Sequence, residues 1–439
     1  MRKTVFKKLR AEGLIEDYNG FRKNLPPKLS KNILIWDETL REGDKTPGVF
    51  LTYTEKVRLA QMLDAVGVAV INLGFPGFSE EEMRTVKKIS NESFESAALA
   101  ASARVLRKDV DACLGCSIEE IVISTPFNGL HLRHILKTSR EDVLKRVTDS
   151  VAHAKTHGFT VSFSLEDASR TPIAEIFQVL EAALNAGADR IVVEDTVGIM
   201  RPLSTHYLMS KIRKGLLELV KKDVSLAIKC FNDFGMATAN TLAAIEEGAT
   251  YALTSVDGNG ERAGLAPLEE VVMAAELLCR SNTSIDVRKL HRLSQLVEKT
   301  FTSPLPFHKS IVGQNAFSHA SDEHVHGMLC HPLAYVPFPP ELIGRQTSYY
   351  LGVHTGSETV EDLLELGKYR ASSEQIDEIV KRVRNSQANV DKGEMIIAFY
   401  QIEKLLKELR KGLTEEDFWK IVKNVMKSPA QTRPPTSRP

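Results

Sequence analysis

Near-continuous apolar runs alternate along the chain with longer stretches in which apolar positions recur at helical spacing. Such runs are typical of strands that are covered on both faces. The eight predicted strands span residues 32–40, 68–75, 95–103, 119–126, 159–167, 189–195, 225–233 and 251–260. Eight β-then-α units in about 250 residues match the size of a (β/α)8 TIM barrel, an α/β fold closed by right-handed crossovers.

The main competing fold is an open, doubly wound sheet. That fold typically has a glycine-rich, nucleotide-binding turn after its first strand. The segment DETLREGDK at 37–45 is not such a turn. The predicted helices carry start signals, with a Ser or Thr three positions before an acidic residue, at 52–55, 79–82 and 139–142. The barrel is therefore the favoured architecture.

The residue composition and the hydrophobic pattern change on both sides of the predicted barrel. We predict an N-terminal extension over 1–31 and the catalytic barrel over 32–290. Residues 291–365 are rich in Pro, His and aromatic residues, which predicts a linker and a small irregular lid subdomain. Three amphipathic segments predict a C-terminal helical subdomain over 366–428, followed by a disordered tail over 429–439.

Composition excludes several classes of protein. The chain has 57 Lys and Arg against 57 Asp and Glu, without a long single-sign block, so nucleic acid and anionic lipid are not expected partners. No apolar run approaches the roughly 18 residues that a membrane span needs. Five scattered cysteines are too few for a disulfide scaffold in a chain this long and fit a reducing compartment. We therefore expect a soluble, cytoplasmic protein.

Polar residues gather where the predicted strands end, which is where the βα loops of a barrel converge. Any one of them could be a salt-bridged rim residue, but so many charges beside apolar strands are costly to bury without a purpose. They are Asp37, Arg41, Glu42, Asn72, Glu166, Asp167, Arg170, Asp195, Thr196, Lys229, Asn232, Asp233, Asp257, Glu261 and Arg262. The set predicts an active site at this end.

Four of these residues indicate chemistry on a small keto acid. Arg41 offers a fixed fork for a carboxylate or an enolate oxygen, with Glu42 beside it. Glu166, at the end of the fifth strand, could hold that arginine in place. The hydroxyl of Thr196 and the backbone after it suit a substrate carboxylate. Together they suggest electrostatic stabilisation of a developing enolate.

Several linked motifs carry a resemblance to a known family. DETLREGDKTPG, SLEDASRTP, EDTVG, NDFGMATANTLAAIEEGA, DGNGERAGLAPLEEV and VGQNAFSH occur in order and at barrel spacing over about residues 32–356. The chain resembles the homocitrate synthase and isopropylmalate synthase branch of the DRE-TIM metallolyase superfamily. The motifs are specific for the superfamily and not for the substrate.

The resemblance implies a Claisen-type acyltransferase that condenses acetyl-CoA, or another acyl-CoA, with a 2-oxo acid. Arg41 would be the family's arginine, Glu42 its metal-binding carboxylate and Glu166 the supporting glutamate. Thr196 would hold the oxo-acid carboxylate. The turn at 260–264, which includes Glu261 and Arg262, would lie near the acyl-CoA.

The resemblance also assigns residues after the barrel. His324 and Tyr335 would be the general-base pair, which in this family reaches across a domain-swapped homodimer into the partner's barrel. From the residues alone, His324 is one imidazole among several in a histidine-rich segment and ranks no higher than His319 or His326.

The chain departs from the family at its metal motif. Family members carry His-x-His at the end of the seventh strand, where this chain has Lys229 and Phe231 in IKCFNDFG. Only Glu42 and Asp257 stand at the remaining ligand positions. Neither lysine nor phenylalanine replaces a neutral imidazole, which argues against ordinary binding of a divalent metal.

Three interpretations of Lys229 stay open. It could act as a fixed ammonium that polarises a ketone without a metal. It could be a Schiff-base lysine of an aldolase or lyase, activated by burial and by Arg41. It could instead form a structural salt bridge to Asp257 or Glu42 in a homologue without catalytic activity.

Other departures concern the substrate. Asn72 stands where many relatives have Glu, and Ser162 stands where homocitrate synthases present an Arg to the distal carboxylate of 2-oxoglutarate. A 2-oxoglutarate substrate is therefore disfavoured. Ser164 and Asn232 complete the predicted substrate-binding residues.

Overall fold

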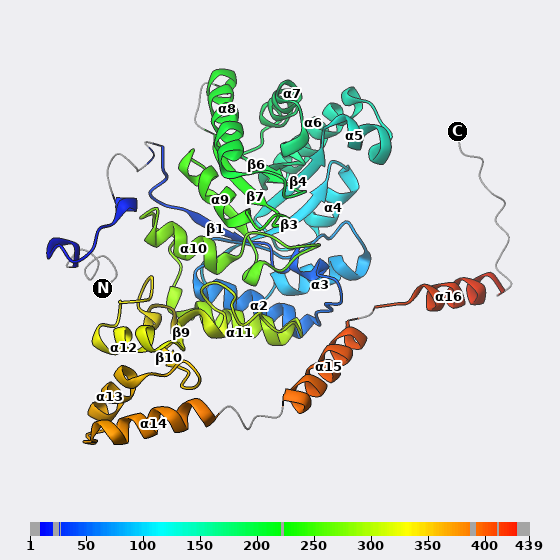
Figure 1. Ribbon diagram of the computed structural model, residues 1–439. Helices are drawn as coiled ribbons and strands as arrows, with labels where there is room; N and C mark the ends of the chain where they lie inside the picture. Colours follow the sequence, from blue (N-terminus) through cyan, green and yellow to red (C-terminus); the bar gives the residue numbers. More distant parts are fainter. Residues whose placement is uncertain are drawn as a thin grey trace.

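A closed barrel of eight parallel strands forms the centre of the computed structural model, which describes residues 9–20, 26, 28–220, 224–386, 392–410 and 412–427 (Figure 1). The strands are β1 (Leu34–Asp37), β2 (Val70–Asn72), β3 (Ala98–Arg104), β4 (Glu120–Pro126), β5 (Thr160–Glu166), β6 (Arg190–Asp195), β7 (Ser225–Cys230) and β8 (Tyr251–Thr254). Each predicted strand is present, and the pairing of β8 with β1 closes the sheet. The barrel is confirmed, and the open doubly wound sheet is excluded.

The period of two along each strand decides which side chains enter the barrel. On β7, Ile228 and Cys230 pack into the large apolar cluster between strands and helices, whereas Ala227 belongs to the smaller cluster inside the barrel. Lys229, two positions after Ala227, therefore also points inward. The interior cluster consists of Trp36, Val70, Ala100, Val122, Val192, Ala227 and Leu253.

Helices cover the outside of the barrel. They are α2 (Tyr53–Val66), α3 (Glu80–Ser90), α4 (Arg107–Leu114), α5 (Gly129–His131), α6 (Arg140–Thr156), α7 (Ile173–Asn185), α8 (Pro202–Val220), α9 (Ala237–Glu246), α10 (Leu268–Leu277) and α11 (Leu290–Thr300). The predicted start signals are confirmed, because Thr52, Ser79 and Ser139 each accept a hydrogen bond from the backbone N–H three residues on. Helix α11 packs against α2 on the outside of the barrel.

Small elements follow the barrel. Helices α12 (Asp322–Cys330) and α13 (Ser357–Leu366) pack together beside a two-stranded parallel ladder of β9 (Ser318–His319) and β10 (Ser348–Tyr349). The three expected C-terminal helices are α14 (Ser373–Ser386), α15 (Lys392–Leu409) and α16 (Glu415–Lys427). The predicted tail over 429–439 lies outside the described residues.

Helices α15 and α16 extend away from the post-barrel elements (Figure 1). Arg410, the residue that follows α15, nevertheless contacts the loop after β1. Its Nη2 donates a hydrogen bond of 2.9 Å to the Pro47 carbonyl. At Gly48, which has φ of 81°, a Cβ would lie 2.5 Å from the Arg410 Cβ, so only glycine fits this approach. In the described part of the chain, no helix is both long and apolar enough to cross a membrane.

Candidate active site

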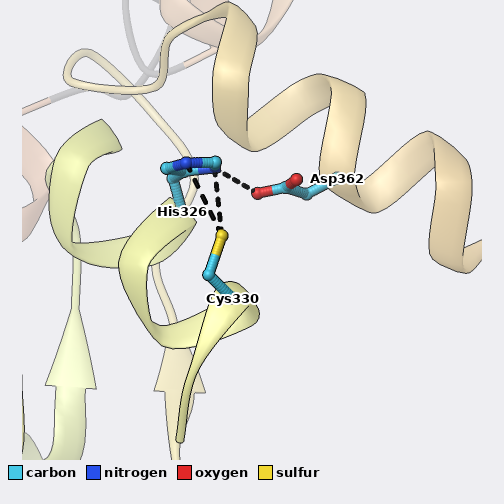
Figure 2. Close-up of side chains that lie close together, drawn as sticks. All are labelled: His326, Cys330 and Asp362. Atoms are coloured by element: carbon cyan, nitrogen blue, oxygen red, sulfur yellow. Dashed lines mark hydrogen bonds and ion pairs between the residues drawn. The ribbon is translucent and has the colours of Figure 1, made fainter. Parts of the chain in front are cut away.

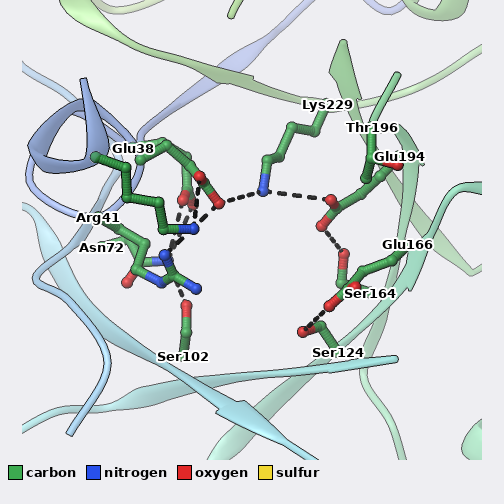
Figure 3. A network of polar contacts seen from close by, with 12 residues as sticks. Glu38, Arg41, Asn72, Ser102, Ser124, Ser164, Glu166, Glu194, Thr196 and Lys229 are labelled. Atoms are coloured by element: carbon green, nitrogen blue, oxygen red, sulfur yellow. Dashed lines mark hydrogen bonds and ion pairs between the residues drawn. The ribbon is translucent and has the colours of Figure 1, made fainter. Parts of the chain in front are cut away.

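Lys229 lies at the carboxyl end of the barrel, clamped between two carboxylates (Figure 3). Its Nζ is 3.0 Å from Glu42 Oε1 and 3.3 Å from Glu194 Oε2. All three side chains are buried. The expected pairing with Glu42 is present, whereas the second partner is Glu194 from the adjacent strand β6 and not Asp257.

The charges of this cluster follow from its partners. Burial alone would lower the pKa of Lys229, but the negative charges of Glu194, Glu42 and Glu38 raise it above the ordinary value. Burial alone would raise the pKa of Glu42, but the cations Lys229, Arg41 and Lys45 hold it far below its usual range. Lys229 is therefore an ammonium and Glu42 a carboxylate at neutral pH.

Arg41 lies on the same side as Glu42. Its Nη1 is 3.8 Å from Glu42 Oε1, and its guanidinium lies 5.4 Å from the centre of the Phe75 ring. The buried Nε of Arg41 has no hydrogen-bond partner within the described residues. Glu166, which we expected to hold this arginine, instead accepts a hydrogen bond of 2.6 Å from Ser124 Oγ. Arg41 thus keeps donor capacity for an anion.

Two further polar contacts complete this end of the barrel. Ser164 Oγ donates a hydrogen bond to Glu194, so it orients the partner of Lys229. Burial, and next to it the charge of Glu194, raises the pKa of Glu166. Glu166 is therefore more easily protonated than a free glutamate, as a proton donor or acceptor requires.

The side-chain amide of Asn72 is hydrogen-bonded to Glu38. Glu38 is a residue of this site that sequence reasoning missed. Asn72 Nδ2 donates hydrogen bonds of 3.0 Å and 3.2 Å to the two Glu38 oxygens and is 3.0 Å from Ser102 Oγ. Burial raises the pKa of Glu38 to about 7. Glu194 was missed as well, although it stands two positions after Val192, so the period-two alternation of β6 could have placed it inside.

The Glu38 shift predicts a pH dependence. As pH rises through about 7, Glu38 gains a negative charge beside the cations, so the KM of an anionic substrate should rise several-fold. The same shift should lower the free energy of unfolding as pH rises from about 4.5 to about 7, because the fold favours the protonated acid. Initial rates and urea unfolding across this range test both. A Glu38→Gln variant should flatten the KM profile and reduce the slope of the stability profile, to which Asp37, whose pKa burial also raises to about 7, contributes as well. An unchanged KM inflection in that variant would contradict the assignment.

The mouth of the barrel carries the predicted substrate-binding turn. Arg262 Nε and Nη2 lie 2.8 Å and 2.9 Å from the Asp233 carboxylate, and Nη2 also donates to the Thr196 carbonyl at 2.7 Å. The guanidinium is 4.8 Å from the centre of the Phe231 ring. Arg262 and Thr196 are thus adjacent, and Glu261 is exposed beside them.

Asn232 has a local structural contact. Its Oδ1 accepts a hydrogen bond of 3.1 Å from the Ala237 backbone N–H, at the start of α9. This contact orients the amide from the loop that follows β7.

Two of the predicted residues lie away from the cluster. Ser162 is at the amino-terminal end of the barrel, where its Oγ is 2.6 Å from Glu120 Oε1 and 2.8 Å from Arg190 Nη1. Asp257 accepts a hydrogen bond of 2.6 Å from Ser294 Oγ on α11, and burial raises its pKa to about 8. The structure therefore brings neither residue to Lys229.

The His324 and Tyr335 rings are stacked, with centroids 4.0 Å apart and an interplanar angle of 16°. Tyr335 Oη donates a hydrogen bond of 3.1 Å to Glu323. Both residues belong to the segment around α12, and these contacts stay within it. The structure brings the predicted base pair together but does not join it to the barrel cluster of the same chain.

The divalent metal that the resemblance implied does not fit these residues. A protonated Lys229 has no lone pair to offer, Phe231 has no donor atom, and Asp257 is turned to Ser294. Within the described residues, the barrel end does not bring three His, Cys, Asp or Glu ligand atoms within 4.8 Å of one another.

Comparison with known proteins agrees with the barrel and its attached subdomain. The family described as HMGL-like matches residues 32–297, and the family described as homocitrate synthase post-HMGL domain-like matches residues 311–391. The chain therefore belongs to the HMGL-like family, in its homocitrate synthase and isopropylmalate synthase branch.

Two relatives illustrate this membership. The 2-isopropylmalate synthase of Methanocaldococcus jannaschii is 41% identical over 378 residues, covering 85% of this chain and 70% of the relative. Homocitrate synthase AksA of Methanothermobacter thermautotrophicus is 38% identical over 386 residues, covering 88% and 96%. The resemblance inferred from the motifs is thus confirmed.

Among solved structures, the HMG-CoA lyase of Bacillus subtilis superposes with a TM-score of 0.56 at 19% identity, covering 64% of this chain and 97% of the lyase. At this identity the similarity shows the fold alone.

Proposed function

We propose that the protein is an acyltransferase that condenses acetyl-CoA, or another small acyl-CoA, with a small 2-oxo acid, using Lys229 in place of a divalent metal. The observation that carries the proposal is the charged Lys229 between Glu42 and Glu194, with Arg41 beside it. The synthase relatives support the reaction class.

The proposed reaction uses the residues in distinct roles. His324 and Tyr335 remove a proton from the acyl methyl group, and the resulting carbanion attacks the ketone carbon of the oxo acid. Lys229 and Arg41 stabilise the negative charge that develops on the ketone oxygen, which then takes up a proton. Water hydrolyses the thioester and releases the CoA thiol. Thr196 holds the oxo-acid carboxylate.

Arg262 and Glu261 support a position for the acyl-CoA. They lie at the barrel mouth, and the Arg262 contact with the Thr196 carbonyl joins this turn to the proposed oxo-acid position. The proposed donor site therefore borders the acceptor site.

We also propose a domain-swapped homodimer. His324 and Tyr335 contact each other and not the Lys229 cluster of their own barrel, which suits a role in the barrel of a partner. Many large apolar side chains of α15 and α16 are exposed, as on a surface that a partner covers. They include Met395, Ile396, Ile397, Phe399, Tyr400, Ile402, Leu405, Leu409, Phe418, Trp419, Ile421, Val425 and Met426. Light scattering should give twice the chain mass, and a monomer would overturn this part.

A thiol-release assay tests the reaction. Purified protein is incubated with acetyl-CoA and a panel of 2-oxo acids, with and without a chelator. We expect CoA release with at least one small oxo acid, at a rate that the chelator leaves unchanged. No release with any acceptor would refute the condensation, whereas release that the chelator abolishes would refute only the role of Lys229.

The Lys229-dependent aldolase is less well supported. A Schiff base needs a neutral amine, and the carboxylates around Lys229 raise its pKa. Borohydride treatment with pyruvate should leave the Lys229 peptide unmodified. A mass increase at that peptide would favour the aldolase.

A further inference from the structure

Three side chains with different metal-binding atoms converge after the barrel (Figure 2). His326 and Cys330 stand one turn apart on α12, and Asp362 faces them from α13. His326 Nδ1 lies 2.7 Å from Asp362 Oδ2, and Cys330 Sγ lies 3.6 Å from His326 Nε2 and 3.9 Å from Nδ1. One ligand atom from each residue fits within 4.8 Å of the others.

These donors match the preferences of one class of cation. Imidazole nitrogen, thiolate sulfur and carboxylate oxygen are the ligands of tetrahedral Zn²⁺, at bond lengths of about 2.0–2.3 Å. Donors in such a site lie about 3.3–3.6 Å apart. The imidazole gives one nitrogen to an ion, and Nδ1 is the one that faces Asp362, with the Cys330 sulfur 3.9 Å from it. Rotation of these partly exposed side chains brings the sulfur a few tenths of an ångström closer and opens the 2.7 Å contact between His326 and Asp362.

The surroundings favour a cation that can enter from solvent. Asp362, Glu358 and Asp322 all place negative charge near His326. Asp322 is already engaged, since it accepts hydrogen bonds from the backbone N–H groups of Gly356 and Thr359. Three protein ligands and a water in the fourth position therefore complete the expected shell.

Cys330 differs from the other cysteines. It is the exposed one, whereas Cys113, Cys116, Cys230 and Cys279 are buried. Cys230 faces the core outside the barrel, so it cannot supply a thiolate to the carboxyl-end cluster. Cys330 is therefore the cysteine that can offer a thiolate to a metal ion that enters from solvent.

We propose that His326, Cys330 and Asp362 bind a zinc ion that joins α12 to α13. The ion would stabilise the packing of α12 on α13, and neither His324 nor Tyr335 belongs to its ligands. The binding site stands independently of the proposed condensation.

Cobalt titration of the metal-stripped full-length chain tests the site. One equivalent of Co²⁺ should produce a thiolate-to-cobalt charge-transfer band, and one equivalent of Zn²⁺ should abolish it. Cys330→Ser should remove the band, and Asp362→Asn should weaken binding at least about tenfold. His331→Gln, which changes a neighbouring imidazole outside the cluster, should leave the titration unchanged.

A second measurement separates a failed site from a misfolded variant. Zn²⁺ should raise the unfolding temperature of the native chain and of His331→Gln but not that of Cys330→Ser, whose circular dichroism should match the native spectrum. Absence of the band in the native chain, or its persistence in Cys330→Ser, would overturn the site. None of these readouts uses the condensation assay, so the two proposals fail separately.

Discussion

Replacing Lys229 with methionine is expected to slow CoA release at least about a hundredfold and to lower the free energy of unfolding by about 3–5 kcal/mol. Methionine keeps most of the side-chain volume but leaves Glu42 and Glu194 without their shared cation. An unpaired buried carboxylate is costly, because the interior cannot replace the lost solvation. The loss of rate follows because, among the residues that the structure describes, Lys229 is the buried ammonium between these two carboxylates.

Urea unfolding and thiol release measure the two effects. Lys45→Met is the matched control, because Lys45 also pairs with Glu42, at 2.8 Å, but its side chain is 40% exposed. The control should lose at most about 1 kcal/mol of stability. Adding Glu194→Gln to Lys229→Met should recover part of the stability and none of the rate. A Lys229→Met protein with native stability would contradict the buried clamp.

Replacing Arg190 with methionine is expected to lower the free energy of unfolding by a similar amount, about 3–5 kcal/mol, while the specific activity of the folded protein stays near native. Arg190 pairs with Glu120 and is 2.8 Å from Ser162 Oγ. Its guanidinium lies 3.8 Å from the Tyr251 ring centre and 5.3 Å from that of Trp36. The variant loses the ion pair and both ring contacts at once.

The activity is expected to survive because the apolar layer inside the barrel separates Arg190 from Lys229. Arg84→Met is the matched control, since Arg84 forms an exposed helical pair with Glu80 and should cost at most about 0.5 kcal/mol. Adding Glu120→Gln should recover part of the lost stability. An Arg190→Met protein that stays stable but is inactive would contradict the assignment of stability to the Arg190 end and of activity to the Lys229 end.

Periodicity explains what the sequence could predict. Strand runs covered on both faces identified all eight strands, and the position of Lys229 near the end of the seventh strand predicted that it lies at the carboxyl end of the barrel. Glu42 could be paired with Lys229 because both follow or end barrel strands at the same rim. These inferences need only local pattern and the closure rule of the fold.

The remaining contacts depend on features that one sequence does not display. Asp257 has φ of 58°, a left-handed conformation in the turn after β8, and its side chain meets Ser294 of α11. Ser162 needs the strand register, which sets it opposite Arg190. Glu194 pairs with Lys229 because the same register places the two residues side by side on β6 and β7. Register and turn conformation are set by tertiary packing.

The apolar layer between the two charged ends also bears on how this barrel can change over time. Groups that share no partners and lie far apart contribute nearly additively to stability. Substitutions around Lys229 therefore leave the stability contributed by the Arg190 end nearly unchanged. Such a barrel can exchange charged residues at one rim while the opposite rim keeps the chain folded.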